Sequence, residues 1–290
     1  MLASCDITAR LIPGMQSLLL ISNAVLLLLL TEAARRILCQ RSEHRRIELS
    51  YRSRLMELEG TFDSPIPVLK VDEFHELFAQ SGLGQGLSLE SEVSFVGGGV
   101  LGGTSHFETW VLSVLAKRAA TLFEFGTGTG RIAYLWARNS APDARVITLT
   151  LGKNQHADYQ FAREDNPLAV LAALAESAFD RFLYSGTQAE HKITQLFGDS
   201  KRFDETPYLK ECDLIFIDGS HAYSYVKSDT EKALRMLREG GLVLWHDYRF
   251  RNLATSGVRR YLDELSETLP LVRLHDTAFV VYRKGTNSEH

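Results

Sequence analysis

The ionisable side chains best placed to carry out chemistry stand at the ends of two apolar runs. Asp218 ends the first run, with His221 three residues later, and His246 and Asp247 end the second. Both runs are predicted to be buried strands, and ligands bind at the carboxyl ends of parallel strands, so these side chains should converge. His246 or His221 could act as a general base. Alternatively, Asp218, His246 and Asp247 could hold a hard divalent ion such as magnesium, or the aspartates could merely cap helices while His221 packs.

A second chemical signal is a glycine-rich turn that joins a short apolar strand to a helix. Glu124 stands two residues before Gly126, and Thr127, Gly128 and Gly130 follow. Glycines allow a sharp turn and a close approach of the backbone to a ligand. The turn fits neither the dinucleotide fingerprint, because an arginine occupies its last position, nor a Walker loop, which needs a Gly-Lys pair. A plain strand-to-helix turn is the structural alternative.

The elements that must position these residues alternate between strand and helix from about residue 104. Such alternation predicts a mostly parallel sheet with helices on both faces. The last two strands are separated by only two residues, too few for a parallel crossover, so they should pair antiparallel. The predicted strands are 121–125, 145–151, 193–197, 213–218, 241–247, 269–275 and 278–283, and helices are expected at 131–139 and 222–238.

Two segments together resemble a known family. The acid before three alternating glycines resembles motif I of class I S-adenosylmethionine-dependent methyltransferases. Residues 216–248 are similar to methyltransferase family 24. This segment contains IDG-x-H and, further along, a glycine pair followed by an apolar stretch and a His-Asp pair. The resemblance covers about 104–283. It implies a Rossmann-like, doubly wound, mostly parallel seven-stranded α/β sheet with an antiparallel C-terminal strand pair.

The resemblance also implies a function and a cofactor. The chain would be an enzyme that transfers a methyl group from S-adenosylmethionine to a small-molecule acceptor, at oxygen rather than nitrogen or carbon. Gly126, Thr127, Gly128 and Gly130 would line the methionine part of the cofactor, and Glu124 would support the loop. A catalytically silent, membrane-tethered interaction module that kept the fold is the alternative. Converging ionisable groups favour the enzyme, because a silent module has no need of them.

Further roles follow from the same resemblance. Asp199, with Ser200 beside it, would lie near the adenine amino group, although an Asx-turn explains Asp199 equally well. Thr150 stands where the family usually carries an acid for the ribose hydroxyls, and a threonine supplies only a neutral hydrogen bond there. The strand-end residues Asp218 and Asp247 are similar to the metal ligands of catechol-type methyltransferases. A histidine replaces one of those acids here, and histidine is a poor magnesium ligand.

The N-terminal part differs in character from the rest. Residues 11–31 carry no charge and are long enough to span a bilayer. A membrane anchor, a cleaved signal peptide and a soluble helix are the competing interpretations. Five arginines follow the run and only Arg10 precedes it, which predicts a cytoplasmic catalytic domain; without an anchor the whole chain would be cytoplasmic. We therefore divide the chain into a hydrophobic segment (1–34), a helical leader with a glycine-rich linker (35–103) and a methyltransferase domain (104–290).

The overall charge narrows the choice of partners. The chain has 32 Lys and Arg against 36 Asp and Glu, a net charge of −4, and the excess of acid lies after residue 60. An acidic domain argues against nucleic acid as a partner, because phosphate binding needs a basic face. Three scattered cysteines predict neither a disulfide framework nor a zinc site. The oligomeric state cannot be deduced from these patterns.

Overall fold

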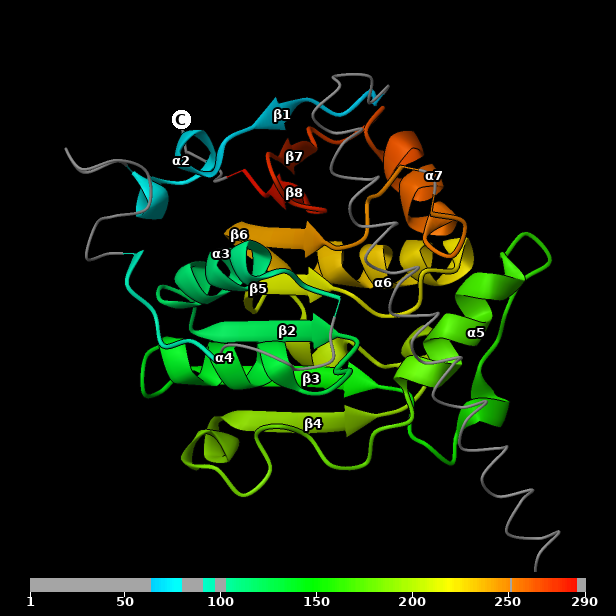
Figure 1. The fold of residues 1–290 in the computed structure, drawn as a ribbon, viewed down its shortest axis with the longest axis horizontal. Helices are drawn as coiled ribbons and strands as arrows, with labels where there is room; N and C mark the ends of the chain where they lie inside the picture. Colours follow the sequence, from blue (N-terminus) through cyan, green and yellow to red (C-terminus); the bar gives the residue numbers. More distant parts are fainter. Residues whose placement is uncertain (1–63, 80–90, 97–102, 251, 286–290) are drawn as a thin grey trace, which may run out of the picture. The chain divides into compact units, whose positions relative to one another are not determined.

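The computed structural model describes residues 64–79, 91–96, 103–250 and 252–285 (Figure 1). They all lie in the compact unit Asp63–His290. The uncharged run 11–31 and most of the helical leader lie outside the described residues. Within the part that is described, no helix is both long enough and apolar enough to cross a membrane.

A mixed sheet forms the centre of the domain. Its strand order, β1-β7-β8-β6-β5-β2-β3-β4, is parallel throughout except where β8 pairs with β6 and β7. The mostly parallel sheet and the antiparallel C-terminal pair are confirmed. The eight strands found in the described residues are β1 (Val68–Leu69), β2 (Thr121–Phe125), β3 (Arg145–Thr150), β4 (Ile193–Phe197), β5 (Cys212–Ile217), β6 (Leu237–Trp245), β7 (Val272–Leu274) and β8 (Val280–Arg283).

The predicted count of seven strands is therefore one too low. The additional strand, β1, pairs parallel with β7 and places Val68 opposite Arg273. It is only two residues long and follows Pro67, so it lacks the alternating pattern by which strands are recognised. The C-terminal hairpin is also shorter than predicted, because the chain turns between Leu274 and Val280, with Asp276 at a φ of +61°.

Helices cover both faces of the sheet (Figure 1). They are α2 (Val71–Phe74), α3 (His106–Ala116), α4 (Arg131–Asn139), α5 (Pro167–Glu176), α6 (Tyr223–Met236) and α7 (Ser256–Leu265). Trp136 of α4 packs edge-on against Phe216 of β5, and its indole N–H donates to Leu112 of α3 over 3.2 Å. On the other face, the indole N–H of Trp245 in β6 donates to Thr230 of α6 over 2.8 Å. Side chains alternate along a strand, so neighbouring positions near the site point to opposite layers.

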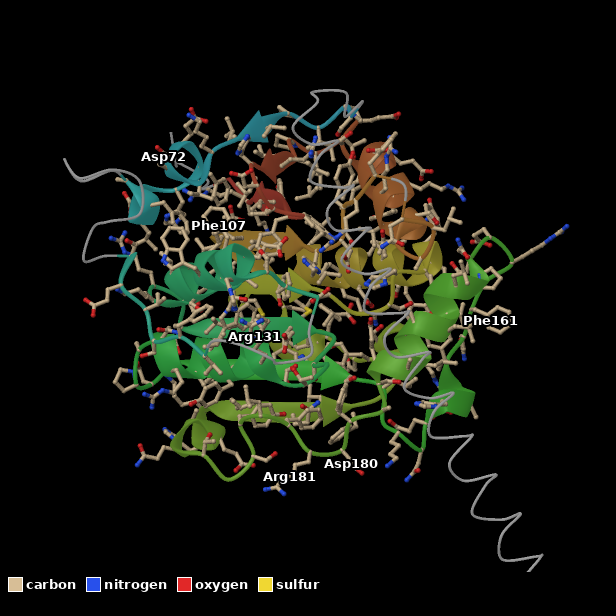
Figure 2. The ribbon with its side chains drawn as sticks, viewed as in Figure 1. Asp72, Phe107, Arg131, Phe161, Asp180 and Arg181 are labelled. Carbon is tan, nitrogen blue, oxygen red and sulfur yellow. The ribbon has the colours of Figure 1, made fainter. Side chains whose placement is uncertain are left out.

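The strand order has a switch point at the carboxyl ends of β2 and β5. From this neighbouring pair the chain winds in opposite directions, through α4 to β3 and through α6 to β6. Ligands of open α/β sheets bind at such a switch point. The loops after β2, β5 and β6, which carry most of the predicted site residues, all begin there. Arg131, the first residue of α4, lies inside the domain, whereas Phe161 is at the surface beside α5 (Figure 2).

Candidate active site

The glycine turn after β2 is built so closely against β5 that one of its residues must be glycine. Gly126 has a φ of +99°, and a Cβ atom there would lie 2.3 Å from the carbonyl oxygen of Asp218. At Gly130 a Cβ would meet Tyr184 at 2.7 Å. Gly128 differs, because its φ is +49° and nothing stands within 4 Å of the position a Cβ would take. The turn therefore offers a ligand an open side at Gly128.

Buried polar side chains support this turn from below. The Thr148 hydroxyl donates to Glu124 Oε2 over 2.6 Å and lies 2.8 Å from the Thr127 hydroxyl, which also accepts from Gln195 Nε2 over 3.1 Å. Burial raises the pKa of Glu124 well above its usual range, despite the hydrogen bond from Thr148. Glu124 is thus a buried support of the loop, in an environment that favours its uncharged form. Thr148 and Gln195 were not predicted, because their polar character shows no pattern along the two strands.

The residues expected near the ribose and adenine lie further along the sheet. Thr150 ends β3, and its carbonyl accepts from Gly198 N–H over 2.9 Å. Asp199 follows β4 and accepts from Lys201 N–H over 3.1 Å, so the Asx-type turn that sequence alone allowed is present. Its second oxygen, Oδ2, is buried without a hydrogen-bond partner. Ser200 stands close enough to the buried Asp229 of α6 to lower the pKa of that carboxyl, although burial raises this pKa by more.

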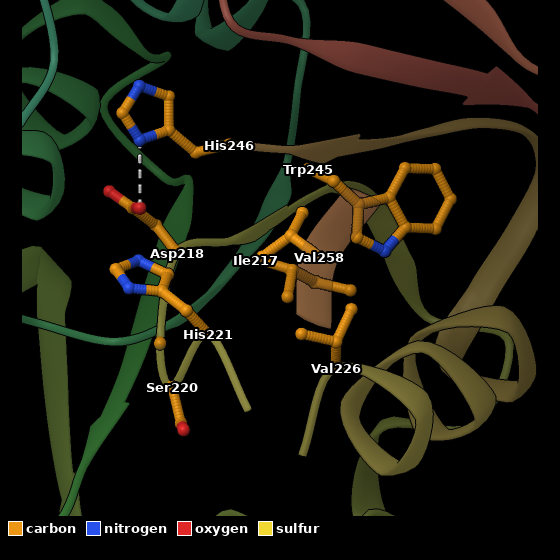
Figure 3. Close-up of a pocket in the computed structure, with 9 residues that line it drawn as sticks. Ile217, Asp218, Ser220, His221, Val226, Trp245, His246 and Val258 are labelled. Atoms are coloured by element: carbon orange, nitrogen blue, oxygen red, sulfur yellow. Dashed lines mark hydrogen bonds and ion pairs between the residues drawn. The ribbon is translucent and has the colours of Figure 1, made fainter. Parts of the chain in front are cut away.

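Asp218, His221 and His246 gather at the ends of β5 and β6 (Figure 3), and Asp247 lies close to them. His221 Nε2 lies 2.9 Å from Asp247 Oδ2, and His246 Nδ1 lies 3.0 Å from Asp218 Oδ1. The polar side chains stand on one side of a small pocket, and Trp245 stands on the other (Figure 3). Asp247 has a φ of +59°, a conformation that is costly for an aspartate and is often retained at functional sites.

A group of potential metal ligands is present, with a membership that differs from the prediction. Asp218, His221 and Asp247 each offer one ligand atom, and these atoms all lie within 4.8 Å of one another. His221 thus takes the place expected for His246. The His246 side chain is only 1% exposed, and its Nε2 points to Glu108 on α3 rather than into the pocket. The reason is the strand alternation, which turns Trp245 and His246 to opposite faces.

The charges of the cluster are strongly coupled. Burial alone would lower the pKa of His246, but the charges of Asp218 and Asp247 outweigh it and raise that pKa well above its usual range. The pKa of His221 is likewise raised, because its hydrogen bond to Asp247 outweighs burial. Burial would raise the pKa of Asp247, yet His246 and His221 hold it well below its usual range. The two aspartates therefore favour the protonated forms of both histidines.

Glu108 is a member of the site that the sequence indicated only as a helix cap. A capping box begins α3, with Ser105 N–H donating to Glu108 Oε2 over 2.6 Å and Glu108 N–H donating to Ser105 Oγ over 3.2 Å. Glu108 Oε1 also accepts from Ala278 N–H over 2.7 Å and lies 3.5 Å from His246 Nε2. Burial would raise the pKa of Glu108, but His246 lowers it to about 2. No sequence pattern pairs Glu108 with His246, because only the tertiary fold brings them together.

One family model matches the part of the chain that contains this site. A family model described as a methyltransferase domain, family 24, matches residues 123–248, which include the glycine turn and both strand ends. No curated protein matches the chain. The match agrees with the methyltransferase resemblance that the sequence motifs predicted.

Solved structures of similar fold include three described as methyltransferases. An O-methyltransferase of Streptomyces achromogenes involved in tomaymycin synthesis, in complex with S-adenosylmethionine, is 17% identical (TM-score 0.41; 64% of this chain and 82% of that chain covered). An O-methyltransferase of Bacillus cereus, in complex with S-adenosylhomocysteine, is 18% identical (TM-score 0.41; 62% of this chain and 82% of that chain covered). A methyltransferase of Podospora anserina, bound to S-adenosylhomocysteine, is 15% identical (TM-score 0.42; 63% of this chain and 80% of that chain covered).

Proposed function

We propose that this methyltransferase acts on an oxygen atom of a small-molecule acceptor. The observation that carries the proposal is the convergence of the open glycine turn with the cluster of Asp218, His221 and Asp247 at one switch point. Methyl transfer from a sulfonium is an in-line displacement, so the protein mainly aligns the acceptor and handles its proton. A hydroxyl needs such help, because it is a weak nucleophile while it is protonated.

The glycine turn fits a cofactor that approaches the backbone closely. Gly128 leaves open space on the ligand side, while Gly126 and Gly130 hold the turn against β5 and Tyr184. Bound S-adenosylmethionine would supply the electrophilic methyl group. We assign its methionine part to the turn above Glu124 and its adenine part to the buried, unpartnered Oδ2 of Asp199.

The cluster at the strand ends fits a divalent ion. Two carboxylates and one imidazole nitrogen lie close enough for shared coordination, and the nitrogen ligand favours manganese or a similar ion over magnesium. Such an ion would lower the pKa of an acceptor hydroxyl. A histidine base is the alternative version, in which a neutral His221 or His246 would accept the proton of the acceptor hydroxyl.

A metal-binding experiment separates the two versions. We expect Mn²⁺ to bind the full chain and the Asp218→Asn and Asp247→Asn variants to lose that binding. Glu205→Gln is a matched control, because Glu205 pairs with Lys232 and Arg235 outside the cluster. If a panel of hydroxylated acceptors yields a methylated product, a chelator should abolish turnover and Mn²⁺ should restore it. Turnover that survives the chelator and falls as the pH drops would instead support the histidine base.

We also propose that residues 11–31 anchor the chain in a membrane, with the catalytic domain in the cytoplasm. The support is the uncharged length of this segment and the arginines that follow it. The full chain should stay with membranes during carbonate extraction, and a 35–290 truncation should not. Recovery of full-length protein in the soluble fraction would contradict the anchor. Removal of the segment in cells would support a signal peptide instead.

A further inference from the structure

The His246 ring is enclosed on every side that the described residues show. Phe279 packs edge-on against it at 5.5 Å between ring centroids, and Phe216 is tilted against it at 6.1 Å. A Cβ at Gly103 would lie 3.5 Å from its Cε1, so the backbone covers that edge. Because the ring cannot turn freely in such packing, each of its two nitrogens has a fixed direction.

The two nitrogens face different parts of the fold. Nδ1 lies 3.0 Å from Asp218 Oδ1 and 3.4 Å from Asp247 Oδ2, which belong to the candidate active site. Nε2 is buried and makes no hydrogen bond that meets the usual geometry, and Glu108 Oε1 stands 3.5 Å away from it. A buried N–H without any acceptor would be costly, so the Glu108 carboxylate is the natural partner of the Nε2 hydrogen.

Glu108 is itself held in place by two other parts of the domain. One oxygen accepts from Ser105 N–H at the start of α3, and the other accepts from Ala278 N–H in the turn between β7 and β8. The carboxylate is almost completely buried. A carboxylate fixed by two backbone donors can orient an imidazole, as carboxylates behind metal-binding histidines do.

We propose that Glu108 is a positioning residue that retains the hydrogen on Nε2 of His246, so that Nδ1 is the ring nitrogen that faces Asp218 and Asp247. This arrangement holds whether the ring is neutral or charged, because the Nε2 hydrogen is present in both forms. The inference extends the proposed function by giving His246 a defined direction, and its test requires neither methyl donor nor acceptor.

The test is proton NMR of the full chain labelled with ¹⁵N-histidine. We expect a slowly exchanging, downfield ring N–H resonance that correlates with Nε2 and is absent from the His246→Asn variant. Glu108→Ala should lose this resonance. Glu108→Gln should move it upfield, because the amide oxygen is an uncharged and weaker acceptor.

Ser105→Ala is the matched control. It removes the hydroxyl that caps α3 and accepts from Glu108 N–H, but it leaves the Glu108 carboxylate in place. We therefore expect the Nε2–H resonance to survive in Ser105→Ala although the helix cap is lost. If Glu108→Ala does not fold, Glu108→Gln decides the matter. A wild-type spectrum without this resonance, a resonance unmoved in Glu108→Gln, or its loss in folded Ser105→Ala would overturn the proposal.

Discussion

Replacing Gly126 with alanine should destabilise the domain much more than the same change at Gly128, two residues later in the same turn. At Gly126 the new Cβ would lie 2.3 Å from the carbonyl oxygen of Asp218 and 2.7 Å from Cα of Gly219, distances that real Cβ atoms do not show. The ends of β2 and β5 would have to separate. At Gly128 the same atom would enter open space.

The magnitudes follow from the local geometry. A left-handed backbone costs an L-residue roughly 1–2 kcal/mol, and this is the whole expected cost at Gly128. At Gly126, overpacking adds roughly 1–3 kcal/mol. Weakening of the 2.9 Å hydrogen bond from Asp218 N–H to the Phe125 carbonyl adds about 1 kcal/mol. The total for Gly126→Ala is then about 3–6 kcal/mol, and at about 2–4 °C per kcal/mol the melting temperature should fall by on the order of 10 °C.

Thermal unfolding of the two variants and the wild type, followed by circular dichroism, measures this difference. We expect Gly128→Ala to melt within about 2–8 °C of the wild type, given the cost of the left-handed backbone alone. Gly128→Ala should still lose affinity for S-adenosylmethionine, because its methyl group occupies the open side of the turn. Equal melting temperatures for Gly126→Ala and Gly128→Ala would refute the steric argument.

Two further predictions concern the pH dependence of stability. Burial raises the pKa of Asp229 from 3.8 to about 7, so folded protein keeps a proton that unfolded protein has lost. The free energy of unfolding should therefore decrease, by at most ~4 kcal/mol, as the pH rises from about 4 to about 7. Asp229→Asn should remove this decrease, which urea titrations across the pH range would measure. Burial lowers the pKa of His75 from 6.5 to about 4, and its Nδ1 accepts from Leu77 N–H over 3.2 Å. The free energy of unfolding should thus decrease as the pH falls from about 6.5 towards 4. His75→Asn keeps an acceptor for Leu77 N–H and should make this decrease smaller. An unchanged dependence of stability on pH would contradict the assignment.

Much of the fold followed from the sequence, because each central strand is a compact apolar run and each crossover helix has a clear apolar face. The strand 121–125 and the helix 131–139 have the predicted bounds. The edge strand β1 did not follow, because two residues carry no periodicity and its pairing with β7 depends on the fold.

The site followed less completely, and the end of β6 shows why. The strand was predicted to run to Asp247, but it ends at Trp245, and Asp247 turns away at a φ of +59°. His246 keeps the alternation of the strand, which turns it to the face opposite Trp245. His246 therefore points towards α3, and His221 joins the aspartates instead. Glu108 is distant from His246 in the sequence, so no local pattern predicts their contact.

The central claim is that the glycine turn binds S-adenosylmethionine, and isothermal titration of the full chain with this cofactor tests it most directly. We expect a single binding event that Gly128→Ala abolishes and that Ser105→Ala, remote from the turn, retains. An absence of heat and of thermal stabilisation up to millimolar cofactor, with protein shown to be folded by circular dichroism, would contradict the claim.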